Sequence, residues 1–416
     1  ANPTQGPNPP PKKQHQASPL RELQQIRFCT MTLVKQIRFA VPAAAAIGAA
    51  AWGGNLALLG LAPVAVALWA SRTRRTAAWL VMLAYYMAVA RGLPIGAAKF
   101  FGGDWAALFA VSLWLGASLA LSLPWALLWS AQRTGYYWRI PVAVILCVIP
   151  PIGLVGWGNP VLAAGVFFPA MGWGGVIAMA LALVAIAYAP WRTGMALAAC
   201  GLAGLMFTAT PAAPEWIEAK DTSYGGAGDG GRDFMRDFAA NQQMIAIAMQ
   251  SKAPYMLFPE TVAGLWTDAT ADLWAEAAEE LKRTGRTVLV GAEIPIDGTN
   301  TTKNALVYVG AEQGQLQQRI PVPVSMWRPW ADSGTVADVM GHGVGQLNGL
   351  RAAVFVCYEQ LLAWPALLSM AAQPQLLVGA ANDYWAADTS IPHIQNMTLR
   401  AWSRAFSVPV VQAVNF

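Results

Sequence analysis

Long apolar runs in the first half of the chain restrict its fold more than any other feature. They fall at about 39–53, 55–71, 76–92, 104–130, 139–158, 161–189 and 193–210. A helix needs about 20 mostly apolar residues to cross the hydrocarbon core of a bilayer, and most of these runs are near that length. Pro169 and the glycines around it are expected to break the sixth run into a half-helix or a re-entrant piece. The pattern predicts a polytopic α-helical membrane bundle of about seven helices over residues 31–210.

Basic residues orient the predicted bundle. They lie before the first run and in alternate loops, at Lys35, Arg38, Arg72, Arg74, Arg75, Arg133, Arg139 and Arg192. Loops rich in Lys and Arg stay on the cytoplasmic side of a membrane, and only Arg91 and Lys99 lie on the opposite side. With an odd number of spans, everything after Thr210 is expected in the periplasm. The prediction is a multi-pass protein of the inner (cytoplasmic) membrane, and the net charge of +5 is attributed to this topology rather than to nucleic-acid binding.

Composition divides the chain into three segments. Residues 1–30 are rich in Pro, Gln and Lys, bury little apolar surface, and are predicted to be a disordered or added extension outside the fold. Residues 31–210 form the predicted bundle. Hydrophobicity falls abruptly near Pro211, where a globular periplasmic domain over 211–416 is expected to begin. Cys357 is the only cysteine of this last segment, so no disulfide is expected there.

Strand-like and amphipathic helical segments alternate in the last segment. Helices are expected at 233–251, at 268–284 and from about 361, and strands at 255–259, 287–294, 304–310, 350–356, 375–381 and 408–414. This order is typical of an α/β layered fold. Glu260 follows the first of these strands and Cys357 follows the fourth, and α/β proteins gather their active sites at the carboxyl ends of strands. The two residues are therefore candidates for one site.

Short motifs in this segment resemble the nitrilase, or carbon–nitrogen hydrolase, superfamily. They are Phe258-Pro-Glu260-Thr, Cys357-Tyr-Glu359, Asn382-Asp383-Tyr-Trp385, Pro392-His393 and Arg400-Ala401, in this order. Together with a membrane bundle they resemble apolipoprotein N-acyltransferases, and residues 319–327 resemble a group of plasmid conjugal-transfer proteins. The resemblance covers about 210–416 by motif and 31–210 by hydropathy and order alone. It implies an αββα sandwich, no cofactor, and a Glu-Lys-Cys triad whose cysteine is acylated and deacylated in turn.

Cys357 and Glu260 have the chemistry that such a reaction needs. A thiol attacks a carbonyl as the thiolate, and a carboxylate whose pKa is raised by burial can take and return its proton. Cys357 is therefore interpreted as the nucleophile and Glu260 as the base. The alternatives are an inert buried thiol and a salt-bridged carboxylate. The resemblance gives Glu359 a supporting role, and a structural role is equally compatible with the sequence.

The segment 316–323 departs from the family pattern, because it holds no Lys. Gln318 or Arg319 occupies the position, depending on a one-residue gap, and Arg319 is taken as the catalytic cation that stabilises the oxyanion. Its planar fork does not reproduce an ammonium group. The acyltransferase activity therefore depends on what replaces the lysine.

Three further residues are assigned supporting roles at the site. They are Asn382, Trp385 and His393, which belong to the motifs near the end of the chain. Their spacing lacks the pattern of a tetrahedral metal site, and only two histidines lie in the last segment. No metal is predicted.

Three functions are compatible with these features. The first is an acyltransferase that moves an acyl chain from phospholipid or another acylated substrate, through a Cys357 thioester, to an amine. The second is an amidase that acts on an exported substrate, and the third is a catalytically silent scaffold of a conjugation apparatus. The first is preferred because it explains why the domain is tethered to a bilayer, and conjugation-apparatus proteins are its expected partners. The position of Arg319 relative to Cys357 is expected to decide whether an enzyme is present.

Overall fold

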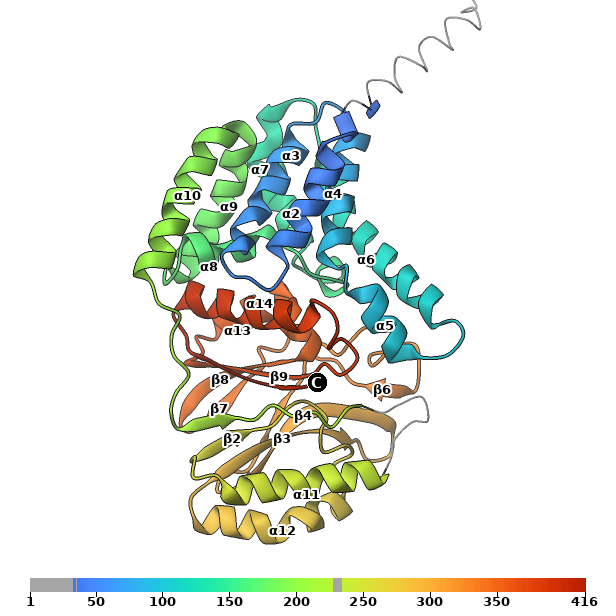
Figure 1. Ribbon diagram of the computed structural model, residues 1–416, viewed down its shortest axis with the longest axis vertical. Coiled ribbons are helices and arrows are strands. Elements are labelled where there is room, and N and C mark those ends of the chain that lie inside the picture. Colours follow the sequence, from blue (N-terminus) through green and yellow to red (C-terminus); the bar gives the residue numbers. More distant parts are fainter. Residues whose placement is uncertain (1–32, 35, 227–233) are drawn as a thin grey trace, which may run out of the picture.

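The computed structural model describes residues 33–34, 36–226 and 234–416, and it stacks a helical part on a part built of two sheets (Figure 1). The predicted disorder of residues 1–30 lies outside the described residues. The last helix of the helical part ends at Phe207, and the first strand begins at Ile217. The change of architecture therefore falls close to the change of composition near Pro211.

The helical part consists mainly of short apolar helices. They are α2 (Ala40–Ala51), α3 (Ala62–Ala70), α4 (Arg75–Val89), α5 (Leu93–Phe101), α6 (Ala106–Leu128), α7 (Tyr136–Leu146), α8 (Ala164–Phe167), α9 (Gly172–Tyr188) and α10 (Pro190–Phe207). Large aromatic side chains such as Trp52, Tyr85 and Trp125 are buried between them. Some of their polar atoms are paired inside: the Trp52 indole donates to the Tyr85 hydroxyl at 2.9 Å, and that hydroxyl donates to the Gly158 carbonyl at 2.9 Å. Apolar burial and paired polar atoms together stabilise this part.

Helix length distinguishes α6 from its neighbours. Among the residues that the structure describes, α6, with 23 residues, is the one single helix long and apolar enough to cross a membrane, and α4 with α5 meets the same criterion only as a pair bent by 52°. The run 139–158 is α-helical only as far as Leu146 and then contains a short 3₁₀ helix, Ile152–Leu154. Pro169 separates α8 from α9 as predicted. Length and composition therefore identify one or two candidate spans, and the prediction of seven is not confirmed.

Two sheets lie face to face in the second part (Figure 1). One has the order β1-β2-β3-β4-β5, with β6 paired to β4, and the other has the order β10-β9-β8-β7. The strands are β1 (Ile217–Ala219), β2 (Tyr255–Leu257), β3 (Thr287–Pro295), β4 (Asn300–Gly310), β5 (Gln315–Gln317), β6 (Ser333–Thr335), β7 (Val344–Leu347), β8 (Leu350–Val356), β9 (Leu376–Asn382) and β10 (Val410–Asn415). Side chains of both sheets, among them Leu257, Leu289, Val354 and Val378, form one buried core between them. The strands that the sequence predicts are confirmed as β2, β3, β4, β8, β9 and β10.

Helices cover the outer faces of both sheets (Figure 1). The first sheet is covered by α11 (Phe234–Gln250) and α12 (Asp268–Arg283), and the second by α13 (Ala363–Ala371) and α14 (Ile391–Phe406). The second part is therefore the αββα sandwich that the sequence resemblance implies.

The helix α14 lies between the second sheet and the helical part and joins them. Gly165 of α8 approaches it so closely that a Cβ atom there would lie 2.2 Å from the Ala401 carbonyl oxygen. The buried Arg404 side chain donates to the carbonyls of Gly165 at 3.1 Å and Gly204 at 2.8 Å. Because these contacts are buried and directional, they fix how the two parts meet.

Candidate active site

Cys357 lies at the carboxyl end of β8, where the chain turns into a short 3₁₀ helix, Cys357–Leu361. Its φ is +47°, a left-handed conformation that costs a residue with a Cβ atom about 1–2 kcal/mol. The side chain is 4% exposed. Burial, and then the negative charge of Glu260 and Asp383, raise the pKa of the thiol well above its ordinary value. The strand end therefore presents a neutral thiol that needs a base.

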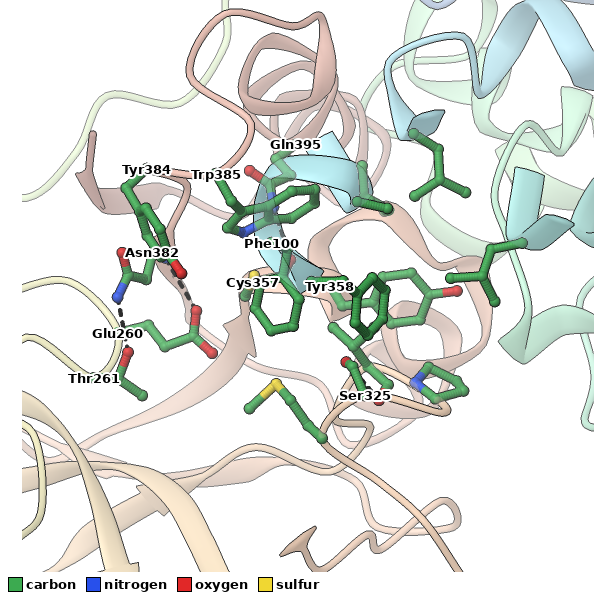
Figure 2. Close-up of a pocket in the computed structure, with 18 of the residues that line it drawn as sticks. Phe100, Glu260, Thr261, Ser325, Cys357, Tyr358, Asn382, Tyr384, Trp385 and Gln395 are labelled. Carbon is green, nitrogen blue, oxygen red and sulfur yellow. Dashed lines mark hydrogen bonds between the residues drawn. The ribbon is translucent and has the colours of Figure 1, made fainter. Parts of the chain in front are cut away.

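Glu260, three residues beyond the end of β2, points into the same cavity as the thiol (Figure 2). Asn304 donates from Nδ2 to Oε1 of Glu260 at 2.6 Å, and the Asn382 backbone N–H donates to Oε2 at 3.0 Å. Burial raises the pKa of Glu260 to about 7, against the opposing effect of hydrogen bonds from Cys357, Asn304 and Asn382. A carboxyl group with a pKa near neutrality is suited to take a proton and return it.

Gln318 links the residue that holds Glu260 to the end of β8, where Cys357 lies. It follows β5, is fully buried, and accepts a hydrogen bond at Oε1 from Asn304 Nδ2 at 3.0 Å. Its Nε2 donates to the Val356 carbonyl at 3.0 Å, one residue before the cysteine. Of the two candidates for the missing lysine, the uncharged Gln318 is therefore the one beside the Glu260–Cys357 pair.

Arg319 lies outside the cavity, so the expected role in oxyanion stabilisation does not fit the structure. Its Nε donates to Glu359 at 3.1 Å, one terminal nitrogen donates to the Ser369 hydroxyl at 2.9 Å, and the other donates to the Val354 carbonyl at 3.0 Å. Neighbouring side chains on an extended segment point to opposite sides, so Arg319 faces away from the site that Gln318 faces. Of the two residues that could stand at the position of the family lysine, the structure therefore places Gln318, and not Arg319, on the side of Glu260.

Glu359 is buried and binds the backbone of the segment that contains Arg319, and it does not line the cavity. Its Oε1 accepts from the backbone N–H groups of Arg319 at 2.9 Å and Ile320 at 3.1 Å, and its Oε2 accepts from that of Val356 at 2.9 Å. These bonds fix the 319–320 segment against the end of β8 and hold the turn in which Cys357 has its left-handed conformation. The contacts favour the structural alternative for Glu359.

Replacement of Arg319 by alanine is expected to lower the free energy of unfolding by about 3–5 kcal/mol, because it leaves the buried Glu359 carboxylate without its cation. Thermal unfolding of the purified variant measures the loss. Arg351→Ala, at an exposed position of β8, is the matched control and is expected to unfold like the wild type. An Arg319→Ala protein that has normal stability but has lost activity would indicate that Arg319 takes part in the reaction.

The Glu260–Cys357 pair opens into a cavity of about 340 Å³ (Figure 2). Asn382 and Trp385 line it beside the pair. The remaining wall is largely apolar and comes in part from the helical part, through Leu93, Ala97, Phe100 and Phe101 of α5 and Leu113 of α6. The approach of α5 is close, because a Cβ atom on Gly96 would lie 2.7 Å from the Trp385 ring. Both parts of the chain therefore build the site.

His393 does not reach this cavity. It lies near Gly54, where an added Cβ would be 2.5 Å from the Cβ of His393, and it lines a different cavity. The structure thus brings together four of the residues selected from the sequence, which are Glu260, Cys357, Asn382 and Trp385. It leaves outside the cavity Arg319, Glu359 and His393.

Sequence motifs did not reveal several polar residues of the site. Asn304 on β4 and Glu293 on β3 lie opposite each other in the first sheet, one holding Glu260 and the other lining the cavity. Gln395 on α14 donates from Nε2 to the Cys357 carbonyl at 3.2 Å. Each residue comes from a different segment, and only the folded chain brings them near Glu260 and Cys357.

Asp383 is a further buried acid beside the pair. Within the described residues neither of its carboxyl oxygens has a hydrogen-bond partner. Burial, and then the neighbouring Glu260 carboxylate, raise its pKa to about 8. Asp383 therefore adds a second group that titrates near neutrality close to Cys357.

The stacked sheets between helix layers, with a cysteine at the end of one strand and a buried glutamate after another, define a nitrilase-like domain. Solved structures similar to the chain include an amidase from Nesterenkonia sp., with 16% identity and a TM-score of 0.35, covering 48% of this chain and 75% of that one. A mutant of that amidase is described as belonging to the nitrilase superfamily. No family model matches the sequence.

Two relatives align with nearly the whole chain. The conjugal transfer protein TraB of Agrobacterium fabrum is 33% identical over 394 residues, which are 89% of this chain and 90% of the relative. The probable conjugal transfer protein TraB of Sinorhizobium fredii is 34% identical over 396 residues, 91% of this chain and 98% of the relative. The chain belongs to the TraB family of conjugal transfer proteins. The resemblance predicted from residues 319–327 is confirmed.

Proposed function

We propose that this protein is a membrane-embedded acyltransferase of a conjugation system, in which Cys357 carries an acyl chain as a thioester. The observation that carries the proposal is the shared cavity, which has the Glu260–Cys357 pair on one side and apolar side chains of α5 and α6 on another. An apolar cavity with a few polar groups at one end suits a fatty acyl chain better than a short polar amide. Phospholipid or another acylated substrate is the proposed donor, and an amine is the proposed acceptor.

Membrane embedding is proposed for residues 31–210, with the nitrilase-like domain of residues 211–416 in the periplasm. Outward-facing apolar side chains support it, among them Leu119, Leu123 and Leu127 of α6 and Leu202 and Met206 of α10, all more than 40% exposed. A soluble protein rarely exposes so many neighbouring apolar groups, whereas a bilayer accommodates them.

The arrangement of basic loops supports the proposed orientation. The loops before α4 and α7 lie at the end of the helical part that is farther from the sheets (Figure 1). At this end Arg72 donates to the Gln36 carbonyl at 2.7 Å, and Arg139 donates to the Leu128 carbonyl at 3.2 Å. Positive charge gathered at one end favours that end as the cytoplasmic one.

A reporter enzyme that is active only after export is expected to be active when fused after Thr210 and inactive when fused within 72–75. The physical reason is that the arginines of this loop resist transfer across the membrane. Activity assays on intact cells, with immunoblots to equalise expression, make the comparison. The reverse pattern of activity would refute the proposed orientation.

The proposed reaction has two steps, each balanced by one proton transfer through Glu260. In the first, Glu260 takes the thiol proton, the Cys357 sulfur attacks the acyl carbonyl, and the donor leaves with the proton that Glu260 returns. In the second, the amine attacks the thioester carbon and gives a proton to Glu260. The carbon–sulfur bond then breaks, and the sulfur recovers that proton. Among the described residues that line the cavity there is no Lys or Arg, so the oxyanion needs another source of stabilisation.

The rate of Cys357 acylation is expected to rise about tenfold per pH unit below pH 7 and to level off above it, because only the ionised base accepts the thiol proton and the pKa of Glu260 is raised to about 7. Release of p-nitrophenol from p-nitrophenyl octanoate measures the acylation rate. A rate independent of pH down to roughly pH 5 would mean that the base is a carboxyl group of ordinary pKa.

Turnover with two substrates separates the proposal from its alternatives. The purified protein in detergent micelles is expected to release a burst of p-nitrophenol with p-nitrophenyl octanoate and then to turn over faster when an amine is added. Steady hydrolysis of a short amide such as acetamide, without a burst from the octanoyl ester, would favour the amidase. A Cys357 thiol that reacts with neither substrate would favour the silent scaffold.

A further inference from the structure

The side chain of Asn415, the last residue of β10, makes four hydrogen bonds although it is fully buried. Its Oδ1 accepts from the Thr222 hydroxyl at 2.8 Å and from the Tyr224 backbone N–H at 2.8 Å. Its Nδ2 donates to the Gly225 carbonyl at 2.8 Å and to Asn382 Oδ1 at 2.7 Å. An asparagine amide has two donor hydrogens and two acceptor sites, so each of them is used once. A buried amide paired in this way cannot turn without losing several hydrogen bonds.

The backbone of Asn415 is fixed from two sides. The strand β10 runs parallel to β9, and Asn415 lies opposite Asn382 in their register. On its other side Asn415 forms an isolated β-bridge with Thr222, and its carbonyl accepts from the Asp383 N–H at 2.8 Å. Asn415 does not line the cavity that holds Cys357. Any effect of Asn415 on the reaction must therefore pass through its neighbours.

Asn382 is the neighbour that reaches Glu260. Its backbone N–H donates to Glu260 Oε2 at 3.0 Å, and its Nδ2 donates to the Thr261 hydroxyl oxygen at 2.9 Å (Figure 2). Because Asn415 donates to Oδ1 of Asn382, the hydrogen-bond network orients the Asn382 amide with its nitrogen toward Thr261. Asn382 thus holds both Glu260 and the residue that follows it.

The turn after Glu260 depends on such bonds. Thr261 has a φ of +52°, in the left-handed region that a β-branched residue rarely adopts. Such a conformation persists only where the surrounding structure maintains it. If the Asn382 amide lost its bond to Asn415, we would expect the turn to relax and the Glu260 carboxylate to lose its donor at Oε2.

We infer that Asn415 is a positioning residue of the active site, which through Asn382 keeps the Glu260 carboxylate in the orientation that takes the thiol proton. The inference rests on the proposed function, in which Glu260 is the base for Cys357. Asn415 touches neither the thiol nor the cavity, and no bond forms or breaks at its side chain. Its effect is therefore expected in the proton transfer from Cys357 to Glu260.

Alanine variants of the two asparagines test the inference, as Asn415→Ala, Asn382→Ala and the double variant. The rate of acylation by p-nitrophenyl octanoate is measured against pH for each, and thermal unfolding shows which variants remain folded. Alkylation of Cys357 by iodoacetamide, mapped by mass spectrometry of its peptide, follows the same proton transfer without an acyl group. Asn396→Ala is the matched control, because Asn396 is exposed and donates to Gln412 of the same strand β10 at 2.7 Å.

The midpoint of the acylation profile is expected to rise by about one pH unit in Asn415→Ala, because the ionised form of Glu260 loses a donor. From a wild-type midpoint near 7, the rate is then expected to fall about fivefold at pH 7 and to return to within about twofold of the wild type at pH 9. A general loss of structure would lower the rate at both pH values alike. The control is expected to have the wild-type profile.

The double variant separates action through Asn382 from an independent structural effect. Its midpoint is expected to equal that of Asn382→Ala, because removal of the Asn382 amide already interrupts the connection to Asn415. Changes in other charges do not complicate the comparison. The titratable side chains whose charges act on or beside Glu260 are the same in every variant: Cys357, Asp383 and Glu293.

A folded Asn415→Ala protein whose midpoint stays near 7 would overturn the inference, as would a double variant in which the two shifts add. If Asn415→Ala does not fold, Asn415→Ser takes its place, because its hydroxyl still accepts from Tyr224 but is too short to donate to Asn382. A wild type that is alkylated but not acylated would contradict the proposed acyl transfer alone, since the alkylation profile then tests Asn415. A wild-type Cys357 that reacts with neither reagent would overturn both.

Discussion

Replacement of Cys357 by serine is expected to abolish acyl transfer while the protein still folds and inserts into the membrane. The rate is expected to fall by at least about a thousandfold, because a serine hydroxyl beside a carboxylate base is far from ionisation at neutral pH. The exchange of sulfur for oxygen hardly changes volume at this buried position, so the free energy of unfolding is expected to change by about 1 kcal/mol or less. Octanoyl transfer to an amine measures the first effect, and thermal unfolding measures the second.

The same variant gives a cellular comparison. If the catalytic proposal is correct, Cys357→Ser is expected to lower the frequency of plasmid transfer although its amount in the membrane is normal. Cys147→Ser, a buried thiol of the helical part, is the control for loss of any cysteine. If a stable Cys357→Ser protein supported plasmid transfer at the wild-type frequency, the result would contradict the enzyme hypothesis and favour the scaffold.

Replacement of Glu260 by glutamine is expected to slow Cys357 acylation by about a hundredfold to ten-thousandfold, the usual contribution of a general base. It also costs stability, because both oxygens of Glu260 accept hydrogen bonds, from Asn304 and Asn382, and an amide has only one acceptor oxygen. The expected loss is about 1–3 kcal/mol. Acylation kinetics and thermal unfolding of the same sample separate the two effects.

The pH profile of the Glu260→Gln variant identifies the base. The rise of the acylation rate below pH 7 is expected to disappear, because the titrating group has been removed. Asp383 is the competing candidate, since its pKa is raised to about 8 and it also lies near the thiol. A profile that keeps its rise in Glu260→Gln and loses it in Asp383→Asn would assign the proton transfer to Asp383.

Glu260 and Cys357 could be selected from the sequence as candidates for one site, because each residue follows a continuous apolar strand. The strands that precede Glu260 and Cys357 read as buried segments on their own, and the sandwich brings their ends to one cavity. The rule that α/β sites lie at strand ends makes both residues candidates, and the resemblance to the nitrilase superfamily assigns their roles. Glu293 and Asn304 could not be selected in this way, because they lie within longer strands. The alternation of polar and apolar residues along a strand does not show whether a side chain faces a cavity or a core.

The replacement for the family lysine could not be predicted, because it depends on register. A shift of one residue turns every side chain of an extended segment to the other face. Composition favoured Arg319 as the only cation of the segment, whereas the folded chain directs it to Glu359 and directs Gln318 to the site. The sequence contains no signal that fixes this choice.

The contribution of the helical part to the site also could not be predicted from the sequence. The contact between α5 and Trp385 joins residues far apart in the chain and leaves no local pattern. The helix α14 was missed although its apolar residues recur with helical spacing, because its buried face also carries polar groups such as Gln395, Thr398 and Arg404. Such groups are buried only because the helix is covered on both sides.

The central claim, that Cys357 carries an acyl chain taken from lipid, is tested most directly by mass spectrometry of the intact protein. The full chain is incubated with vesicles of phosphatidylethanolamine and phosphatidylglycerol that carry a deuterated acyl chain. The predicted result is the mass of one deuterated acyl group, mapped to Cys357, absent from Cys357→Ser and removed by hydroxylamine as a thioester is. A wild-type protein that binds these vesicles and keeps an unmodified Cys357 thiol would contradict the account.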